Sequence, residues 1–284
     1  MHGEKGLRAQ GVAAVVFDWA GTIIDFGSHA PMGAFVELFA SEGIAISIDE
    51  ARIPMGMPKW DHIKALGLQP RIAAAWLSAK GAAFSDADVD RLYTIFTPMN
   101  IAALPRHATL ISGVVPMMAD LRQQGIRIGS TTGYNREIMA VLVPLAEAQG
   151  FTPDNLVCAG DLPENRPSPL GMYRCFLDLG VWPAHRVVKV DDTVPGLMEG
   201  RHAGCWTVGV LASGNEVGLT EAQWQALGAD EQGRLREKAR SRLTEASPDF
   251  WVDTVAELPM VIARIDALLA EGAQPAPLPR QTGG

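Results

Sequence analysis

The sequence predicts an α/β protein with a doubly wound, Rossmann-like parallel-sheet core and an inserted, all-helical cap domain. The apolar run Val12–Phe17 ends abruptly at Asp18, as a buried strand would. Between about 106 and 271, short apolar runs alternate with helix patterns, which is typical of parallel sheets covered on both faces. Between 28 and 105, helix patterns follow one another without a convincing strand.

The core elements are placed from these runs, because short apolar stretches indicate strands and longer amphipathic patterns indicate helices. The expected strands are Val12–Phe17, Ile126–Gly129, Leu156–Cys158, Val187–Val190 and Trp206–Val210. The expected helices lie at about 115–124, 136–148, 168–178 and 194–202. Their alternation favours one parallel sheet.

The segment 28–105 is interpreted as a second domain inserted after the first strand. One helix begins at Pro31 and stops at Gly43, and a capping box from Ser47 to Glu50 opens the next. The remaining helices are expected from Pro58, over 70–79 and over 86–103.

The predicted domains are a core of residues 1–27 and 106–271, a cap of residues 28–105, and a disordered, proline-rich tail of residues 272–284. Open α/β sheets bind ligands at the carboxyl ends of their strands, so we expect the cap to lie over that edge. Hinges near 26–30 and 103–108 would allow it to close.

Composition and charge exclude several classes of protein. The 284 residues include 24 Lys and Arg against 32 Asp and Glu, and the net charge of −8 disfavours a general nucleic-acid binder. No apolar run approaches the ~20 residues that span a bilayer, and the N-terminus lacks the apolar segment of a signal peptide. Cys158, Cys175 and Cys205 are interpreted as reduced, buried thiols. We therefore expect a cytoplasmic protein with neither nucleic acid nor membrane as a partner.

Side chains suited to phosphoryl transfer follow four of the expected strands. They are, in order, Asp18, Thr132, Arg166 and the pair Asp191-Asp192. A carboxylate can attack phosphorus, a hydroxyl and a guanidinium can hold its oxygens, and paired acids can hold Mg²⁺. The cation is needed because two anionic groups ~4 Å apart repel by ~4 kcal/mol even at an effective dielectric constant of about 20. Four such motifs in this order resemble those of the haloacid dehalogenase superfamily.

Position 20 departs from ordinary phosphatases of that superfamily, which carry an aspartate there to protonate the leaving group. Because this chain has Ala20, its leaving group must depart without that proton. Lys59 offers another route, since it lies in the first turn of the helix expected from Pro58, where the helix dipole should lower its pKa. A neutral lysine can form a Schiff base that accepts the departing electrons, with His62, one turn further on, as proton partner.

The segments that carry these residues resemble the phosphonoacetaldehyde hydrolase (phosphonatase) family. The likeness runs from about 12 to 270 and includes Phe17–Thr22, Pro54–His62, Gly129–Tyr134, Arg166-Pro167 and Lys189–Thr193. It implies hydrolysis of the C–P bond of phosphonoacetaldehyde, a small-molecule phosphonate, to acetaldehyde and phosphate with Mg²⁺ as cofactor. The pairing of Ala20 with a cap lysine makes the likeness specific, because ordinary phosphatases lack it.

The resemblance also implies a role for each site residue. Asp18 is implied as the nucleophile that becomes an aspartyl-phosphate, and Lys59 as the amine that forms the imine. Magnesium is implied to be held by Asp18, the backbone carbonyl of Ala20, and Asp192. The residues implied to bind or line the substrate are Thr132, Arg166, His62, Met55 and Tyr134.

One position departs from the family pattern. An acidic residue four positions beyond Asp192 is familiar in this family, but the chain has Gly196, which leaves Asp191 as the candidate replacement. Two other functions stay open: a phosphate-ester phosphatase or phosphomutase of the same superfamily, and a non-catalytic phosphate-binding relative. The resemblance also implies a homodimer through the cap, for which the apolar face of the helix at 31–42 is the candidate surface.

Overall fold

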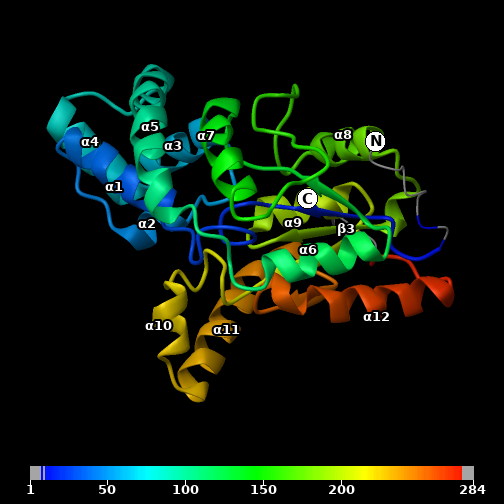
Figure 1. Cartoon of the computed structure of the whole chain (residues 1–284). Coiled ribbons are helices and arrows are strands. Elements are labelled where there is room, and N and C mark those ends of the chain that lie inside the picture. Colours follow the sequence, from blue (N-terminus) through cyan, green and yellow to red (C-terminus); the bar gives the residue numbers. More distant parts are fainter. Residues whose placement is uncertain (1–7, 9, 277–284) are drawn as a thin grey trace, which may run out of the picture.

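The computed structural model describes residues 8 and 10–276, and its centre is a five-stranded parallel sheet (Figure 1). The strand order is β2-β1-β3-β4-β5, and Val15 of β1 lies opposite both Ile128 of β2 and Val188 of β3. The strands are β1 (Ala14–Phe17), β2 (Arg127–Ser130), β3 (Val187–Asp191), β4 (Trp206–Val210) and β5 (Phe250–Val252). The α/β class and the parallel sheet are therefore confirmed.

Helices cover both faces of the sheet because alternate residues of its strands point to opposite faces. Val15 and Phe17 join one hydrophobic cluster with residues of α6 and α12, whereas Val16 joins another with residues of α8. Figure 1 shows α6 and α12 below the sheet and α8 and α9 above it. The core helices are α6 (Val114–Gln123), α7 (Arg136–Glu147), α8 (Leu170–Leu179), α9 (Val194–His202) and α12 (Leu258–Ala270).

One expected strand is wrong. Leu156–Cys158 forms only an isolated bridge between Val157 and Thr131, just beyond the end of β2. The segment turns away at once, because the carboxylate of Asp161 accepts a hydrogen bond from the backbone N–H of Cys158 and Gly160 has a positive φ of 88°. Arg166 consequently follows a loop rather than a strand.

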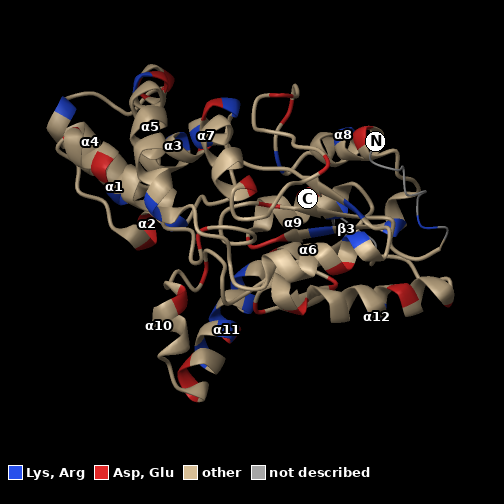
Figure 2. Ribbon diagram, in the orientation of Figure 1, with Lys and Arg blue, Asp and Glu red and all other residues tan. Residues whose placement is uncertain are grey.

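The C-terminal elements of the core have no counterpart in the sequence-based prediction. Strand β5 extends the sheet beyond β4, and α10 (Glu221–Gln225) and α11 (Ala229–Leu243) lie between them in the chain. Helix α11 carries charges of both signs along its length and buries only Ala239 and Leu243, so it lacks the apolar stripe that marks a helix in a sequence (Figure 2). The short 3₁₀ helices are η1 (Ala184–Arg186), η2 (Thr244–Ala246) and η3 (Val255–Glu257).

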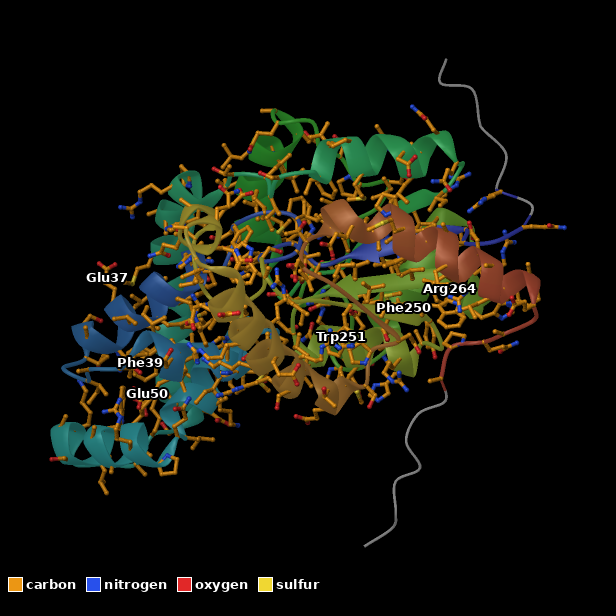
Figure 3. All side chains as sticks on the ribbon, turned by 90° about the horizontal axis from the view of Figure 1, so that it is seen from below. Glu37, Phe39, Glu50, Phe250, Trp251 and Arg264 are labelled. Atoms are coloured by element: carbon orange, nitrogen blue, oxygen red, sulfur yellow. The ribbon has the colours of Figure 1, made fainter. Side chains whose placement is uncertain are left out.

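Between β1 and α6 the chain forms five helices and no strand in the described residues. They are α1 (Ala30–Ser41), α2 (Ile48–Arg52), α3 (Lys59–Gly67), α4 (Pro70–Lys80) and α5 (Asp86–His107). They share a hydrophobic cluster of their own, in which the rings of Phe35 and Phe96 stack 4.4 Å apart. Phe39 of this cluster lies far from Phe250 and Trp251 of β5 (Figure 3). We propose on this basis that α1–α5 form the cap as a separate domain.

Two details of the cap differ from the sequence-based expectation. Helix α5 continues past 103 to His107, so the second expected hinge falls within its last turns. The apolar face of α1 is already covered, because Leu38 and Phe39 are buried in the cap cluster and α1 packs along α5. That face is therefore not available for dimerisation.

The beginning of the expected disordered tail is ordered against the core. The N–H of Ala276 donates to Asp249, and the carbonyl of Ala276 accepts a hydrogen bond from Arg201. The rest of the expected tail, 277–284, lies outside the described residues. The three cysteines are free and buried, as expected. In the described part of the chain no helix combines the length and apolarity needed to cross a membrane.

The cap cluster predicts that substitutions of two leucines differ in their effect on the free energy of unfolding. Leu38 is fully buried in α1, so Leu38→Ala should lower the free energy of unfolding by ~2–5 kcal/mol. Leu77 of α4 is 52% exposed, so Leu77→Ala should change it by no more than ~0.5 kcal/mol. Urea denaturation of the two variants measures the difference, and equal losses would contradict a cap core centred on α1.

Candidate active site

Three carboxylates meet at the carboxyl ends of two neighbouring strands. Asp18 directly follows β1, Asp191 ends β3, and Asp192 comes next. Because β1 and β3 are paired in parallel, their ends lie side by side, and carboxylate oxygens of the three residues lie within 4.8 Å of one another. All three residues are buried, with exposures of 6%, 0% and 0%.

Burial raises the pKa of two of these acids, Asp18 and Asp192. It raises the pKa of Asp18 to about 6, with repulsion from Asp191 adding to the effect and Arg166 opposing it. Burial also raises the pKa of Asp192 well above its usual range, with Asp18 and Asp191 contributing. Clustered carboxylate oxygens are the ligands that Mg²⁺ prefers, and a divalent cation would relieve this repulsion. The donor set therefore fits magnesium.

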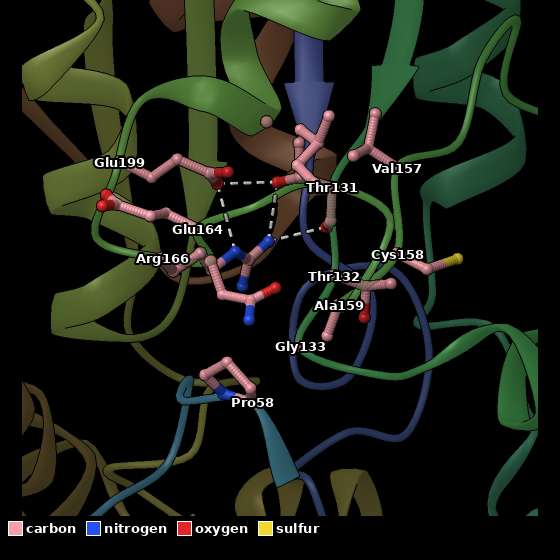
Figure 4. A pocket seen from close by; sticks show the side chains of 13 residues that line it. Pro58, Thr131, Thr132, Gly133, Val157, Cys158, Ala159, Glu164, Arg166 and Glu199 are labelled. Atoms are coloured by element: carbon pink, nitrogen blue, oxygen red, sulfur yellow. Dashed lines mark hydrogen bonds and ion pairs between the residues drawn. The ribbon is translucent and has the colours of Figure 1, made fainter. Parts of the chain in front are cut away.

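Arg166 ties the nucleophile candidate to the rest of the site. Its Nη1 donates to Oδ1 of Asp18 at 2.8 Å and lies 3.3 Å from Oδ2 of Asp191. Its Nε donates to Glu199 at 3.1 Å, and its Nη2 donates to the backbone carbonyl of Thr131 at 2.6 Å. Figure 4 shows the guanidinium between Glu199 and Thr131 in a second pocket, which does not include Asp18 or Lys59, with Pro58 of the cap facing it. These bonds fix the orientation of the guanidinium beside Asp18.

Lys189, Glu199 and Thr131 belong to this network, although the sequence analysis gave them no role. Nζ of Lys189 donates to Oγ1 of Thr131 at 2.6 Å and lies 3.1 Å from Asp191 and 3.4 Å from Glu199. Oγ1 of Thr131 also accepts a hydrogen bond from Arg166 and donates to Glu199, so its one hydrogen and both lone pairs are used. The signal in the sequence was a lysine within the apolar strand Val187–Val190, because a fully buried lysine requires partners.

Lys59 comes from the cap. It is the first residue of α3, with Pro58 as the N-cap rather than the first helical residue, and it is 5% exposed. Nζ lies 3.9 Å from Sδ of Met55 and 5.1 Å from the ring centroid of Tyr134, and it forms no ion pair with any described residue. Burial lowers the pKa of Lys59 to about 8, with Asp18 and Asp192 acting in the opposite direction. Burial, rather than the helix dipole inferred from the sequence, is the largest cause.

Cap and core residues line one small pocket. The cap contributes Met55, Gly56 and Lys59. The core contributes Asp18, Ala20, Thr132, Gly133, Tyr134, Arg166 and Thr193. The amine and the carboxylate that the sequence placed in different domains therefore face the same cavity.

Of the predicted site residues, His62 does not line this pocket. It is fully buried in α3, its Nε2 lies 2.8 Å from the carbonyl of Ala51, and its ring stacks on Phe35 at 4.0 Å. Burial lowers the pKa of His62 well below its usual range, and nearby Lys59 adds to the effect. His62 is therefore neutral and supports α3 from within the cap.

Comparisons with known proteins agree with this geometry. A family model described as haloacid dehalogenase-like hydrolase matches residues 12–204. A phosphonoacetaldehyde hydrolase from Paraburkholderia xenovorans is 51% identical over 93% of this chain and 99% of its own length, and one from Vibrio vulnificus is 45% identical over 93% and 98%. A crystal structure of a phosphonoacetaldehyde hydrolase-like protein from Oleispira antarctica superimposes with a TM-score of 0.92 at 44% identity, covering 97% of this chain and 100% of that one.

The chain belongs to the phosphonoacetaldehyde hydrolase family. It is accordingly an enzyme, a hydrolase of the haloacid dehalogenase type. A β-phosphoglucomutase from Clostridium difficile has a TM-score of 0.66 at 16% identity, which shows a shared fold alone.

The glycine at position 196, where the sequence analysis expected an acidic residue, has a steric explanation. A Cβ atom on Gly196 would lie 1.9 Å from Oδ2 of Asp191. The carboxylate of Asp191 is held there by the N–H and Oγ1 of Thr193, at 3.0 and 2.7 Å, and by its ion pair with Lys189. Asp191 thus fills the space that a side chain at 196 would enter, so one carboxylate at most can be accommodated.

This exclusion predicts that Gly196→Ala forces the carboxylate of Asp191 to move. We expect a loss of ~1–3 kcal/mol in the free energy of unfolding, as for an overpacked site, together with weaker Mg²⁺ binding. Gly233→Ala in α11 is the matched control, because nothing lies within 4 Å of its Cβ position and alanine favours a helix by ~0.5–1 kcal/mol. Urea denaturation and titration calorimetry with Mg²⁺ measure both quantities. Similar behaviour of the two variants would show that Asp191 is not confined by Gly196.

Proposed function

We propose that this chain hydrolyses the C–P bond of phosphonoacetaldehyde to acetaldehyde and phosphate. The observation that carries the proposal is that Lys59 and Asp18, from different parts of the chain, line the same pocket. The names of the relatives, which match this chain along nearly their whole length, support the choice of substrate.

The carbon end requires an electron sink, because a primary carbanion is too basic to depart unaided. The amine of Lys59, whose pKa burial lowers to about 8, can attack the substrate aldehyde and lose water to give a protonated imine. The imine lies next to the carbon bonded to phosphorus, so the C–P electrons can move into an enamine. This route needs no acid at position 20, where the pocket is lined by Ala20.

Phosphorus is taken by the carboxylate. In the proposed sequence, Asp18 attacks phosphorus as the C–P bond breaks, and an aspartyl-phosphate forms. Water then attacks this phosphorus and releases phosphate, while the enamine is protonated on carbon and the imine is hydrolysed from Lys59. One water is released when the imine forms and two are consumed later, so one water is consumed per turnover.

The surrounding residues would orient the phosphonate. Arg166 presents its guanidinium beside Asp18, and Thr132 lines the same pocket, so both are placed to bind phosphonate oxygens. Mg²⁺, held by Asp18, the carbonyl of Ala20 and Asp192, would offset the repulsion between the nucleophile and the phosphonate. Met55 and Tyr134 would enclose Lys59 and exclude water from the imine.

We also propose a cytoplasmic homodimer formed through the cap. Because the apolar face of α1 is covered, the contact would use other cap side chains, of which Ile53, Leu68 and Leu77 are 63%, 56% and 52% exposed. Exposed apolar side chains on one domain are a common feature of subunit interfaces. Light scattering of the purified chain tests the oligomeric state.

Trapping separates the two halves of the proposed mechanism. With phosphonoacetaldehyde and borohydride, peptide mapping by mass spectrometry should find the adduct on Lys59 in the wild-type chain. Asp18→Asn should keep the adduct and lower phosphate release by about a thousandfold or more, because the imine forms without the carboxylate. Lys59→Arg should lose both adduct and turnover. Wild-type hydrolysis of phosphate esters that survives Lys59→Arg would instead favour a phosphatase.

The lowered pKa of Lys59 also predicts a pH dependence. Only the neutral amine attacks an aldehyde, so the trapping rate should fall about tenfold per pH unit well below the pKa of about 8 and level off above it. The measurement is the initial rate of adduct formation at a series of pH values. A rate that keeps rising toward 10.5, the ordinary pKa of lysine, would show that Lys59 is not desolvated.

A further inference from the structure

Arg52, the last residue of α2, joins the cap to the core. Its Nη1 donates to the carbonyl of Gly27 at 2.7 Å, the carbonyl of Asn215 at 3.2 Å and Oδ1 of Asn215 at 3.1 Å. Its Nη2 lies 3.4 Å from the carbonyl of Gly218. The acceptors belong to the linker between β1 and α1 and to the loop after β4, residues 213–218, which we call the latch loop. One cap side chain thus contacts two separate segments outside the cap.

The latch loop is shaped to receive this guanidinium. Gly218 has a φ of +65°, and a Cβ atom there would lie 2.8 Å from Cζ and Nε of Arg52. The positive φ favours glycine at this position, and a side chain there would displace the guanidinium of Arg52. Asn215 is 1% exposed, and its Nδ2 lies 3.4 Å from the carbonyl of Arg52, so the contact runs in both directions.

The same loop contacts the catalytic carboxylates from its other side. The backbone N–H of Asn215 donates to Oδ2 of Asp192 at 2.7 Å. Oγ of Ser213 donates to the carbonyl of Gly21, in the turn after Asp18, at 2.8 Å. The loop is therefore shared between the cap contact and the carboxylate cluster.

From these contacts we infer that Arg52 is a positioning residue, a latch that holds the cap closed over Lys59 and Asp18. Any movement that separates α2 from the latch loop must break its hydrogen bonds to Gly27, Asn215 and Gly218. Charge-assisted bonds of this kind contribute more than neutral ones, so their loss should favour the open cap. The inference uses the proposed function only to identify Lys59 as the enclosed amine.

Labelling of lysines tests the latch without turnover. A sulfosuccinimidyl biotin ester is too large for the closed pocket, so it should reach Lys59 only when the cap opens. In Arg52→Ala, labelling of Lys59 at fixed pH should rise about tenfold to a hundredfold, the shift expected when such hydrogen bonds are lost. Arg52→Lys, which keeps the charge but not the planar donor set, should give an intermediate rate. Peptide mapping by mass spectrometry measures the rates.

Three controls distinguish opening of the cap from unfolding of the chain. Lys189, fully buried in β3, should stay unlabelled, and the partly exposed Lys64 should label as in the wild type. Arg71→Ala is the matched variant, because Arg71 contacts Glu50 and the carbonyl of Ala45 within the cap and has no hydrogen bond to a core residue that the structure describes. It should leave the labelling of Lys59 unchanged.

The latch is overturned if Lys59 is labelled at the wild-type rate in Arg52→Ala, or if Lys189 becomes labelled in parallel with Lys59. If Arg52→Ala does not fold, Asn215→Ala removes one acceptor and should raise the rate in the same direction, and an unchanged rate there overturns the latch equally. If Arg52→Ala raises the labelling of Lys59 but the wild-type chain releases no phosphate from phosphonoacetaldehyde, the proposed function is refuted and the latch stands. If the wild-type chain releases phosphate but Arg52→Ala does not change the labelling of Lys59, the latch is refuted and the proposed function stands.

Discussion

The structure depends on how its buried carboxylates are compensated by buried cations. Asp18, Asp191 and Asp192 are brought together by the pairing of β1 with β3 and are buried. Unpaired carboxylates in such a place would be costly, and Arg166 and Lys189 supply the two buried cations that compensate them. The position of Arg166 then depends on Glu199 and Thr131, so α9, the segment just after β2 and the loop after residue 160 are all fixed by one group of charges.

Burial shifts the pKa of an acid and the pKa of an amine in opposite directions. Burial disfavours the charged form of any group, so it raises the pKa of Asp18 and lowers that of Lys59. Burial thereby raises the fraction of Lys59 that is neutral at a given pH, in the same pocket as the carboxylate of Asp18. Both effects require the closed position, because water in an open cleft would solvate both groups. This connects the chemistry of Lys59 to contacts such as those of Arg52 with the latch loop, which lie outside the pocket.

Local patterns in the sequence predicted those elements whose apolar residues are periodic or continuous. Strands buried on both faces are rich in apolar residues, which is why the apolar runs Val12–Phe17 and Val187–Val190 were identified as strands. The capping box at Ser47 marks the start of α2 in the structure. The prediction failed where such patterns were weak or misleading. The run at Leu156–Cys158 is apolar yet pairs at one residue, and β5 is a three-residue strand at the edge of the sheet. Pairing partners and not composition decide these cases.

The sequence by itself determined which chemical groups are present and in what order: Asp18, the alanine at 20, Lys59, Arg166 and the acids after β3. Only the tertiary structure decided that Lys59 and Asp18 share a pocket, that Asp191 occupies the space above Gly196, and that Lys189 and Glu199 complete the charge network. The physical reason is that periodicity and spacing report local conformation. Distances between groups far apart in the chain are set by strand pairing and by the packing of the cap on the core.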